Sequence, residues 1–260
     1  MTTLRVNGIS LHVQVLAPVA ERAAPAVLVH GLGVDTLASW YFTLAGAVND
    51  TGRRVVMYDL RGHGRSERPA TGYRLDDFVD DLAGLLAALG VTGPVCLLGN
   101  SFGGTVAFGY ALRHPERVSG IVAIESAPPV EEWLSRAHRR LELPAARERY
   151  GASTLAADLG SSRPTDPAEL AGITCPVLCV YGAESGLAAA LPRIRNWLPQ
   201  ARMAVVPGQR HTVLVDAPAA VRELVLPWLD TLEGRHPDDR TDLGALDHHQ
   251  QRPLRLDTAL

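Results

Sequence analysis

The chain has 260 residues, enough for one α/β domain with a full hydrophobic core. Hydrophobic residues make up 47% of the sequence and charged residues 20%, as in an ordinary soluble globular protein. The net charge of −3 gives no basic field for a polyanion, so we expect no nucleic-acid partner. A signal-peptide pattern and an apolar run of membrane-spanning length are both absent from the sequence. We therefore expect a cytoplasmic protein without membrane association.

Strand signals open the chain and recur along it. Residues 4–16 alternate between apolar and polar side chains around Asn7-Gly8, which predicts a β-hairpin. Six continuous apolar runs follow, as expected for strands of a parallel sheet that is covered on both faces. These runs are residues 26–31, 54–60, 95–100, 120–126, 176–182 and 202–208. Helical patterns separate the runs, so we predict an eight-stranded, mostly parallel, doubly wound α/β sheet with a leading antiparallel hairpin.

Three helices are predicted from local signals. Residues 75–90 carry Asp76, Asp77, Asp80 and Asp81 toward their start, where the helix dipole favours anions, and end at Gly90. Residues 101–115 form a helix that stops at a proline, and residues 217–234 form a helix that closes the domain. All three cysteines lie in or beside apolar runs, and we expect them to be reduced core residues.

One interval breaks the alternation of strands and helices. Residues 127–172 contain Trp133, many Arg and Glu, and no strand pattern. We predict a short helical cap there, inserted into an α/β core formed by residues 1–126 and 173–234. Residues 235–260 are polar and lack a period, which predicts a polar C-terminal tail. We expect its two adjacent histidines, at 248 and 249, to be solvated rather than to bind a metal.

The segment "LLGNSFGG" matches the pattern G-x-S-x-G at Gly99, Ser101 and Gly103. It lies between a predicted strand and a predicted helix, the context in which a sharp turn exposes a nucleophilic serine. The backbone N–H of Phe102, at the helix start, would then face an oxyanion at the reacting carbon. The alternative is a glycine-rich turn without chemistry. The flanking strand and helix favour the nucleophile.

Two further loops follow strands. "VLVHGLG" (27–33) offers a second oxyanion donor, the N–H of Leu32 with that of Gly33 as the alternative, while His30 is expected to be structural. His211 lies between the last predicted strand and the final helix, where a neutral imidazole could deprotonate Ser101.

Together these segments resemble the α/β-hydrolase fold superfamily. The similarity runs from about Val6 to Leu232 through "HGLG", "YDLRGHGRS", "GNSFGG" and "PGQRH". The resemblance implies hydrolysis through a Ser–His–acid triad, without a metal or other cofactor. In "DLRGHGRS" we expect Asp59, His63 and Ser66 to be loop scaffolding.

The acid of the triad departs from the family pattern. In most relatives an Asp stands three residues beyond the glycine of "VLCVYGAES", and here that position is Ser185. Three readings follow: the acid is Glu184, it lies elsewhere, or the triad is incomplete. "AIESAPPVEEW" resembles the segment that carries the acid in haloalkane dehalogenases and a coelenterazine-type luciferase, and it places Glu125 at the matching position. A carboxylate that ends an apolar strand also needs a partner. We therefore predict Glu125, with Glu184 as the alternative.

The predicted function is a cofactor-independent serine hydrolase acting on an ester, thioester or lactone of a small hydrophobic substrate. Ser101, His211 and Glu125 form the triad, and the Leu32 and Phe102 amides form the oxyanion hole. Candidate pocket residues are Gly31, Trp40, Trp133 and Leu214. The alternative is a non-hydrolytic cyclase or lyase, or a ligand-binding protein of a biosynthetic pathway. The sequence leaves the substrate and the oligomeric state open.

Overall fold

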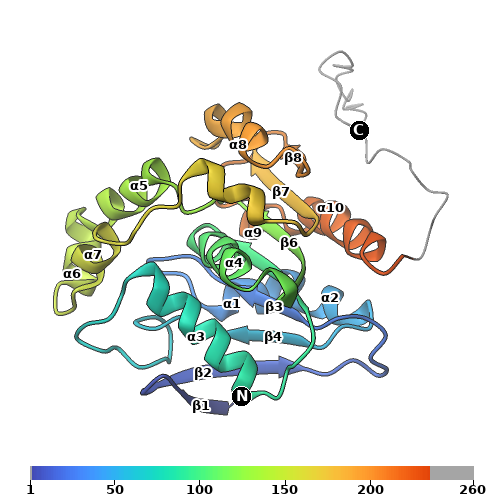
Figure 1. The fold of residues 1–260 in the computed structure, drawn as a ribbon, viewed down its shortest axis with the longest axis horizontal. Coiled ribbons are helices and arrows are strands. Elements are labelled where there is room, and N and C mark those ends of the chain that lie inside the picture. Colours follow the sequence, from blue (N-terminus) through green and yellow to red (C-terminus); the bar gives the residue numbers. More distant parts are fainter. Residues whose placement is uncertain (1, 235–260) are drawn as a thin grey trace, which may run out of the picture.

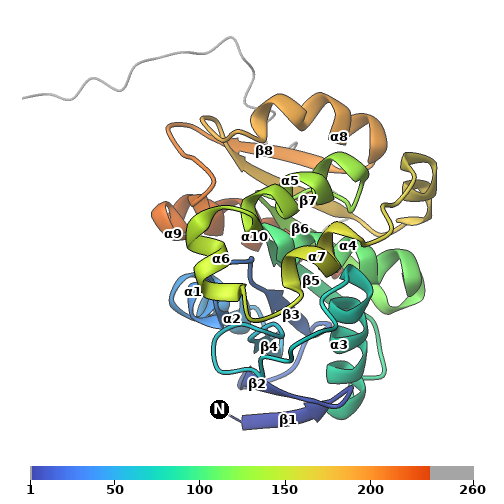
Figure 2. The ribbon, with the colours of Figure 1, turned by 90° about the vertical axis from the view of Figure 1, so that its left-hand side faces the viewer.

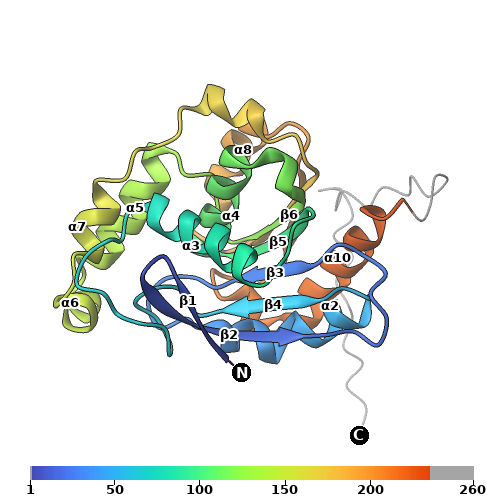
Figure 3. The same cartoon turned by 60° about the horizontal axis from the view of Figure 1, so that its bottom comes forward.

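A computed structural model describes residues 2–234 as an eight-stranded sheet with helices on both faces (Figure 1). The strand order is β1-β2-β4-β3-β5-β6-β7-β8. Strand β2 runs antiparallel to both β1 and β4, and every other pair is parallel. The predicted fold class is confirmed. Figure 3 shows the β1–β2 pair at one edge of the sheet, beside β4.

Each predicted apolar run forms a strand. The strands are β1 (Thr2–Val6), β2 (Ile9–Leu16), β3 (Ala26–Val29), β4 (Val55–Tyr58), β5 (Val95–Asn100), β6 (Val118–Ile124), β7 (Val177–Gly182) and β8 (Arg202–Val206). The hairpin turn has positive φ at Asn7 (48°) and Gly8 (81°), the conformation for which this pair is favoured. The central strands β3, β4 and β7 are buried at every position, which explains why their apolar runs are continuous.

Successive residues of these strands point to opposite faces, so the sheet separates two apolar cores. One core packs under α3 (Leu75–Ala88), α4 (Phe102–Arg113) and α8 (Leu191–Trp197). The other packs under α1 (Leu37–Trp40), the π-helical turn η1 (Tyr41–Ala45), α2 (Gly46–Asp50), α9 (Val213–Asp216) and α10 (Pro218–Thr231). The cysteines Cys96, Cys175 and Cys179 are buried in these cores as free thiols, and burial raises the pKa of Cys96 to about 12.

Between β6 and β7 the chain forms only short helices: α5 (Glu131–Leu141), α6 (Pro144–Tyr150), α7 (Leu155–Gly160) and η3 (Pro167–Gly172). Figure 2 shows α5, α6 and α7 lying together on one side of the molecule. Hydrogen bonds to the rest of the domain anchor this segment. The Trp133 indole N–H donates to Thr105 of α4, and the Asp158 carboxylate accepts the backbone N–H groups of Gly72 and Tyr73 at 3.0 Å. Its separation from the core as a cap stays a prediction.

The remaining turns η2 (Pro115–Arg117) and η4 (Ala188–Ala190) connect these elements. Among residues 2–234, every helix falls short of the length and apolarity needed to cross a membrane. The predicted polar tail, with its two histidines, lies outside the described residues.

The aspartates near the start of α3 have different roles. Asp77 lies in the first turn, where the dipole favours it as predicted, and it also caps the helix by accepting the backbone N–H of Arg74 at 2.8 Å. Asp81 does not serve the helix dipole, contrary to the sequence prediction, because it is the seventh residue of α3 and the dipole acts on the first turn. Its buried carboxylate instead accepts two hydrogen bonds from Arg61, from Nε at 2.7 Å and from Nη2 at 2.6 Å. This pair ties the loop after β4 to α3.

We expect Asp81→Ala to lower the free energy of unfolding by about 3–5 kcal/mol, because the buried Arg61 guanidinium loses its hydrogen-bonded counter-charge and keeps only the partly exposed Asp77 at 3.9 Å. The neighbouring Asp80 pairs with Arg113 at 2.6 Å, and both side chains are more than 40% exposed. Asp80→Ala should therefore cost less than about 1 kcal/mol. Urea unfolding of both variants tests this. Equal losses would contradict a structural role for the buried pair.

Candidate active site

Ser101 stands at the turn between β5 and α4 with the backbone strained. Its φ of 52° and ψ of −119° lie outside the usual regions, and its N–H donates to the Ile124 carbonyl at 2.8 Å. Close approach requires glycine on both sides. A Cβ at Gly99 would lie 2.3 Å from the Gly104 Cα, and one at Gly103 would lie 2.0 Å from the Val29 carbonyl oxygen. The turn therefore points the Ser101 hydroxyl out of the sheet edge.

His211 reaches this hydroxyl from the loop between β8 and α9. Its Nε2 lies 3.0 Å from Ser101 Oγ, within hydrogen-bond distance. The other ring nitrogen, Nδ1, lies 3.0 Å from Glu125 Oε2. An ionised carboxylate only accepts hydrogen bonds, so Nδ1 carries the proton and Nε2 presents its lone pair to the serine.

Glu125 directly follows β6 and is fully buried. Like Ser101 it has a positive φ, of 50°, and its N–H donates to the Val180 carbonyl at 2.8 Å. Besides His211, two groups on the β7 side donate to the carboxylate: the Gly182 N–H to Oε1 at 2.6 Å and the Ser185 hydroxyl to Oε2 at 2.5 Å. These donors offset the cost of burying the charge.

The alternative acid is turned away from the histidine. The Glu184 side chain is 56% exposed and pairs with Arg210 at 3.5 Å. Ser185, which holds the position that is usually acidic in the family, instead contacts Glu125. The structure thus brings Ser101, His211 and Glu125 together and leaves Glu184 outside.

The candidate oxyanion donors lie on two loops. Among residues 2–234, the backbone N–H groups of Leu32 and Phe102 have no hydrogen-bond acceptor. The N–H of Gly33 is engaged, because it donates to His63 Nε2 at 3.3 Å. Leu32 and Phe102 therefore keep the donors that an oxyanion needs, and Gly33 does not.

Two buried histidines hold the loop that carries Leu32. His30 donates from Nδ1 to the Gly31 carbonyl at 2.7 Å, and its Nε2 accepts the Leu60 N–H at 2.9 Å. His63 donates from Nδ1 to the Arg61 carbonyl at 2.9 Å. Both rings thus need one protonated and one free nitrogen. Burial lowers the pKa of His30, and burial together with the nearby His30 lowers the pKa of His63 to about 3.

Two side chains that the sequence analysis did not single out complete this loop. Asp35 Oδ2 accepts the Gly31 N–H at 2.7 Å and the Asn100 side-chain amide at 3.2 Å, which links the oxyanion loop to the residue before the nucleophile. From α6, the Tyr150 hydroxyl donates to the Gly33 carbonyl, and its ring lies 5.4 Å from that of His63. No sequence signal indicated Tyr150, because contacts between segments far apart in the sequence leave no local pattern.

The four predicted pocket residues have different surroundings. A Cβ at Gly31 would lie 3.2 Å from Ser101 Cβ, so Gly31 borders the nucleophile. Trp133 belongs to the core on the α4 face, whereas Trp40 and Leu214 are packed in the core on the α10 face. Their role in binding substrate stays a prediction.

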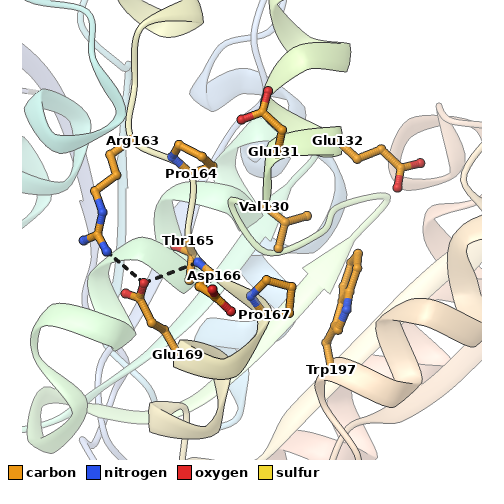
Figure 4. Close-up of a pocket in the computed structure, with 10 residues that line it drawn as sticks. All are labelled: Val130, Glu131, Glu132, Arg163, Pro164, Thr165, Asp166, Pro167, Glu169 and Trp197. Atoms are coloured by element: carbon orange, nitrogen blue, oxygen red, sulfur yellow. Dashed lines mark hydrogen bonds and ion pairs between the residues drawn. The ribbon is translucent and has the colours of Figure 1, made fainter.

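Two open grooves lie apart from the triad residues themselves. Figure 4 shows the larger, of about 480 Å³, between the start of α5, residues 163–169 and Trp197. A second, of about 300 Å³, is lined by residues 34–36, 38–39, 42–43 and 215, next to the oxyanion loop and α9. Neither is lined by Ser101, Glu125 or His211.

Comparison with known proteins agrees with the fold. The model of the alpha/beta hydrolase fold family matches residues 25–149. A solved structure of E-2-(acetamidomethylene)succinate hydrolase superposes with a TM-score of 0.71 and 25% identity, covering 88% of this chain and 98% of that one. The chain has the α/β-hydrolase fold.

Two curated hydrolases are similar in sequence. The 2-hydroxymuconate semialdehyde hydrolase of Pseudomonas sp. (strain CF600) is 42% identical over 116 residues, which are 42% of this chain and 40% of that enzyme. The 2-(acetamidomethylene)succinate hydrolase of Mesorhizobium japonicum is 28% identical over 217 residues, covering 67% of this chain and 78% of that enzyme. The first match thus spans less than half of the relative.

We expect acid to destabilise the protein through His63. Below pH 6.5 the unfolded chain takes up a proton at this residue that the folded protein does not, so stability falls as the pH drops from 6.5 toward 3. At pH 5 the loss is about 2 kcal/mol. Urea unfolding at pH 7.5 and pH 5 should show a smaller acid loss in His63→Gln than in the natural protein. An identical loss in both would contradict burial of the neutral ring.

Proposed function

We propose that the protein is a serine hydrolase that cleaves an ester, thioester or lactone of a small hydrophobic molecule. The observation that carries the proposal is the chain of contacts from Ser101 Oγ to His211 to Glu125, with 3.0 Å at each step. A hydroxyl, an imidazole and a buried carboxylate in this order can activate a nucleophile at neutral pH.

In the first half-reaction Ser101 Oγ attacks the carbonyl carbon and its proton passes to His211 Nε2. Glu125 stabilises the imidazolium that results. The oxyanion of the tetrahedral intermediate accepts the Leu32 and Phe102 N–H groups, and one such donor contributes about 10²–10³-fold in rate. When the intermediate collapses, His211 returns the proton to the leaving alcohol or thiol, and an acyl-enzyme remains on Ser101.

In the second half-reaction a water molecule takes the place of the leaving group. His211 accepts a proton from the water as its oxygen attacks the acyl carbon, and the same two amides bind the second oxyanion. Collapse returns that proton to Ser101 Oγ and releases the acid. In each half-reaction His211 gives back the proton that it accepted, so the imidazole ends the cycle unchanged.

The similar hydrolases support hydrolysis and favour a second candidate substrate class. The matches to 2-hydroxymuconate semialdehyde hydrolase and to 2-(acetamidomethylene)succinate hydrolase point to small unsaturated acids whose cleaved bond is not an ester. The same nucleophile and base would serve both classes. Turnover of a panel of p-nitrophenyl esters, set against those two compounds, separates the candidates. Binding without turnover of any of them would instead favour a ligand-binding protein.

Ser101 should react covalently with a fluorophosphonate. We expect intact-protein mass spectrometry to show one adduct and peptide mapping to place it on Ser101, because the activated hydroxyl attacks phosphorus as it attacks carbon. Ser101→Ala removes the nucleophile and should give no adduct. Folded protein that fails to react would overturn the proposal.

Substitution of the two candidate acids should have unequal effects. Glu125→Gln keeps the side-chain size but removes the charge that stabilises the imidazolium, and we expect kcat to fall by about 10³-fold or more. Glu184→Gln, the matched control on an exposed side chain, should change kcat by less than about twofold. Steady-state hydrolysis of p-nitrophenyl butyrate measures both. The reverse ranking would move the acid to Glu184.

A further inference from the structure

The Glu125 carboxylate is held from the β7 side by the loop that follows that strand. Its oxygen Oε1 accepts the Gly182 N–H at 2.6 Å. Its oxygen Oε2 accepts both the Ser185 hydroxyl at 2.5 Å and His211 Nδ1 at 3.0 Å. One carboxylate oxygen therefore receives two donors, one from the imidazole and one from Ser185.

The Ser185 hydroxyl is itself fixed in direction. Ser185 is 6% exposed, and its Oγ accepts the Leu187 N–H at 3.1 Å, so its proton is directed to the glutamate. Two backbone hydrogen bonds hold the surrounding turn. The Ser185 N–H donates to the Gly182 carbonyl and the Ala188 N–H donates to the Ser185 carbonyl, both at 3.0 Å. The donor thus stands on a backbone that is already ordered.

Glutamate needs such a constraint more than aspartate would. Its side chain has one more rotatable bond, and it starts here from a residue with a φ of 50°. If Oε2 moved, the direction of the His211 ring would move with it, and so would the Nε2 lone pair that faces Ser101.

We propose that Ser185 is a positioning residue of the triad, which orients the Glu125 carboxylate toward His211. Two residues thereby share the role of the catalytic acid. Glu125, which follows β6, supplies the charge, and Ser185, in the loop after β7, supplies the hydroxyl that orients its carboxylate. This inference rests on the proposed serine-hydrolase function and deepens it.

A purely structural role for Ser185 predicts something different. The hydroxyl also satisfies the Leu187 N–H, so its removal should lower stability whether or not it acts on the triad. Ser162 offers a matched control, since it is also buried and its Oγ accepts the Leu75 N–H at 2.9 Å while donating to the Asp158 carbonyl. Ser162→Ala should lower the melting temperature and leave kcat unchanged.

The test compares Ser185→Ala and Ser185→Cys with Ser162→Ala in hydrolysis of p-nitrophenyl butyrate. Cysteine keeps nearly the same shape but is a weak donor, so it covers the case in which the alanine variant fails to fold. For both Ser185 variants we expect kcat to fall by about tenfold, the effect of one hydrogen bond to a charged group, with KM within about twofold. The rate of fluorophosphonate labelling at Ser101 should fall by the same factor.

The outcomes separate this inference from the function on which it rests. If the natural protein neither hydrolyses the ester nor labels at Ser101, the proposed function is wrong. If the natural protein is active and a folded Ser185→Cys variant keeps its kcat and labelling rate, Ser185 is not a positioning residue. A raised KM at constant kcat would equally overturn the inference, because it would place Ser185 in substrate binding.

Discussion

Two neighbouring strand ends carry the constraint on which the site depends. Asn100 at the end of β5 pairs with Ile124 at the end of β6. The residues that directly follow them, Ser101 and Glu125 respectively, both have a φ near +50°. Both backbones remain tied to the ladder, Ser101 to the Ile124 carbonyl and Glu125 to the Val180 carbonyl, at 2.8 Å each. The strain is held by hydrogen bonds on either side, so the nucleophile and the carboxylate keep a fixed separation. His211 needs only to fit between them.

The surrounding loops hold the triad and the oxyanion loop through hydrogen bonds. Glu125 is the buried charge of the triad, and Gly182, Ser185 and His211 all donate to it. The histidines under the oxyanion loop stay neutral near pH 7, because burial lowers the pKa of both His30 and His63. A proton on either ring would remove the acceptor for a backbone N–H. Neutral histidine rings that hold the oxyanion loop, and a Glu125 carboxylate fixed by three donors, make a preorganised environment that favours charge development at one place.

Much of the fold could be predicted from the sequence, because buried parallel strands and their turns leave local patterns. The apolar run that ends in Glu125 and the serine at position 185 together predicted an acid directly after β6. Glu125 Oε2 lies 3.0 Å from His211 Nδ1, and its catalytic role is a proposal. Contacts between a loop and a helix distant from it in the sequence left no local pattern. Examples are the hydrogen bond from Tyr150 to the Gly33 carbonyl and that from Arg61 to Asp81. Apolar character alone also does not distinguish a pocket residue from a core residue. Trp40, a predicted pocket residue, is packed in the core on the α10 face.

The central claim is that Ser101, His211 and Glu125 act as one unit with the Leu32 and Phe102 amides. The most direct test is a crystal structure of the protein after reaction with a fluorophosphonate. The account predicts phosphorus bonded to Ser101 Oγ, a phosphoryl oxygen within hydrogen-bond distance of both amides, and the His211 ring still held by Glu125. Phosphorus on another residue, or a His211 ring directed at Glu184, would contradict it.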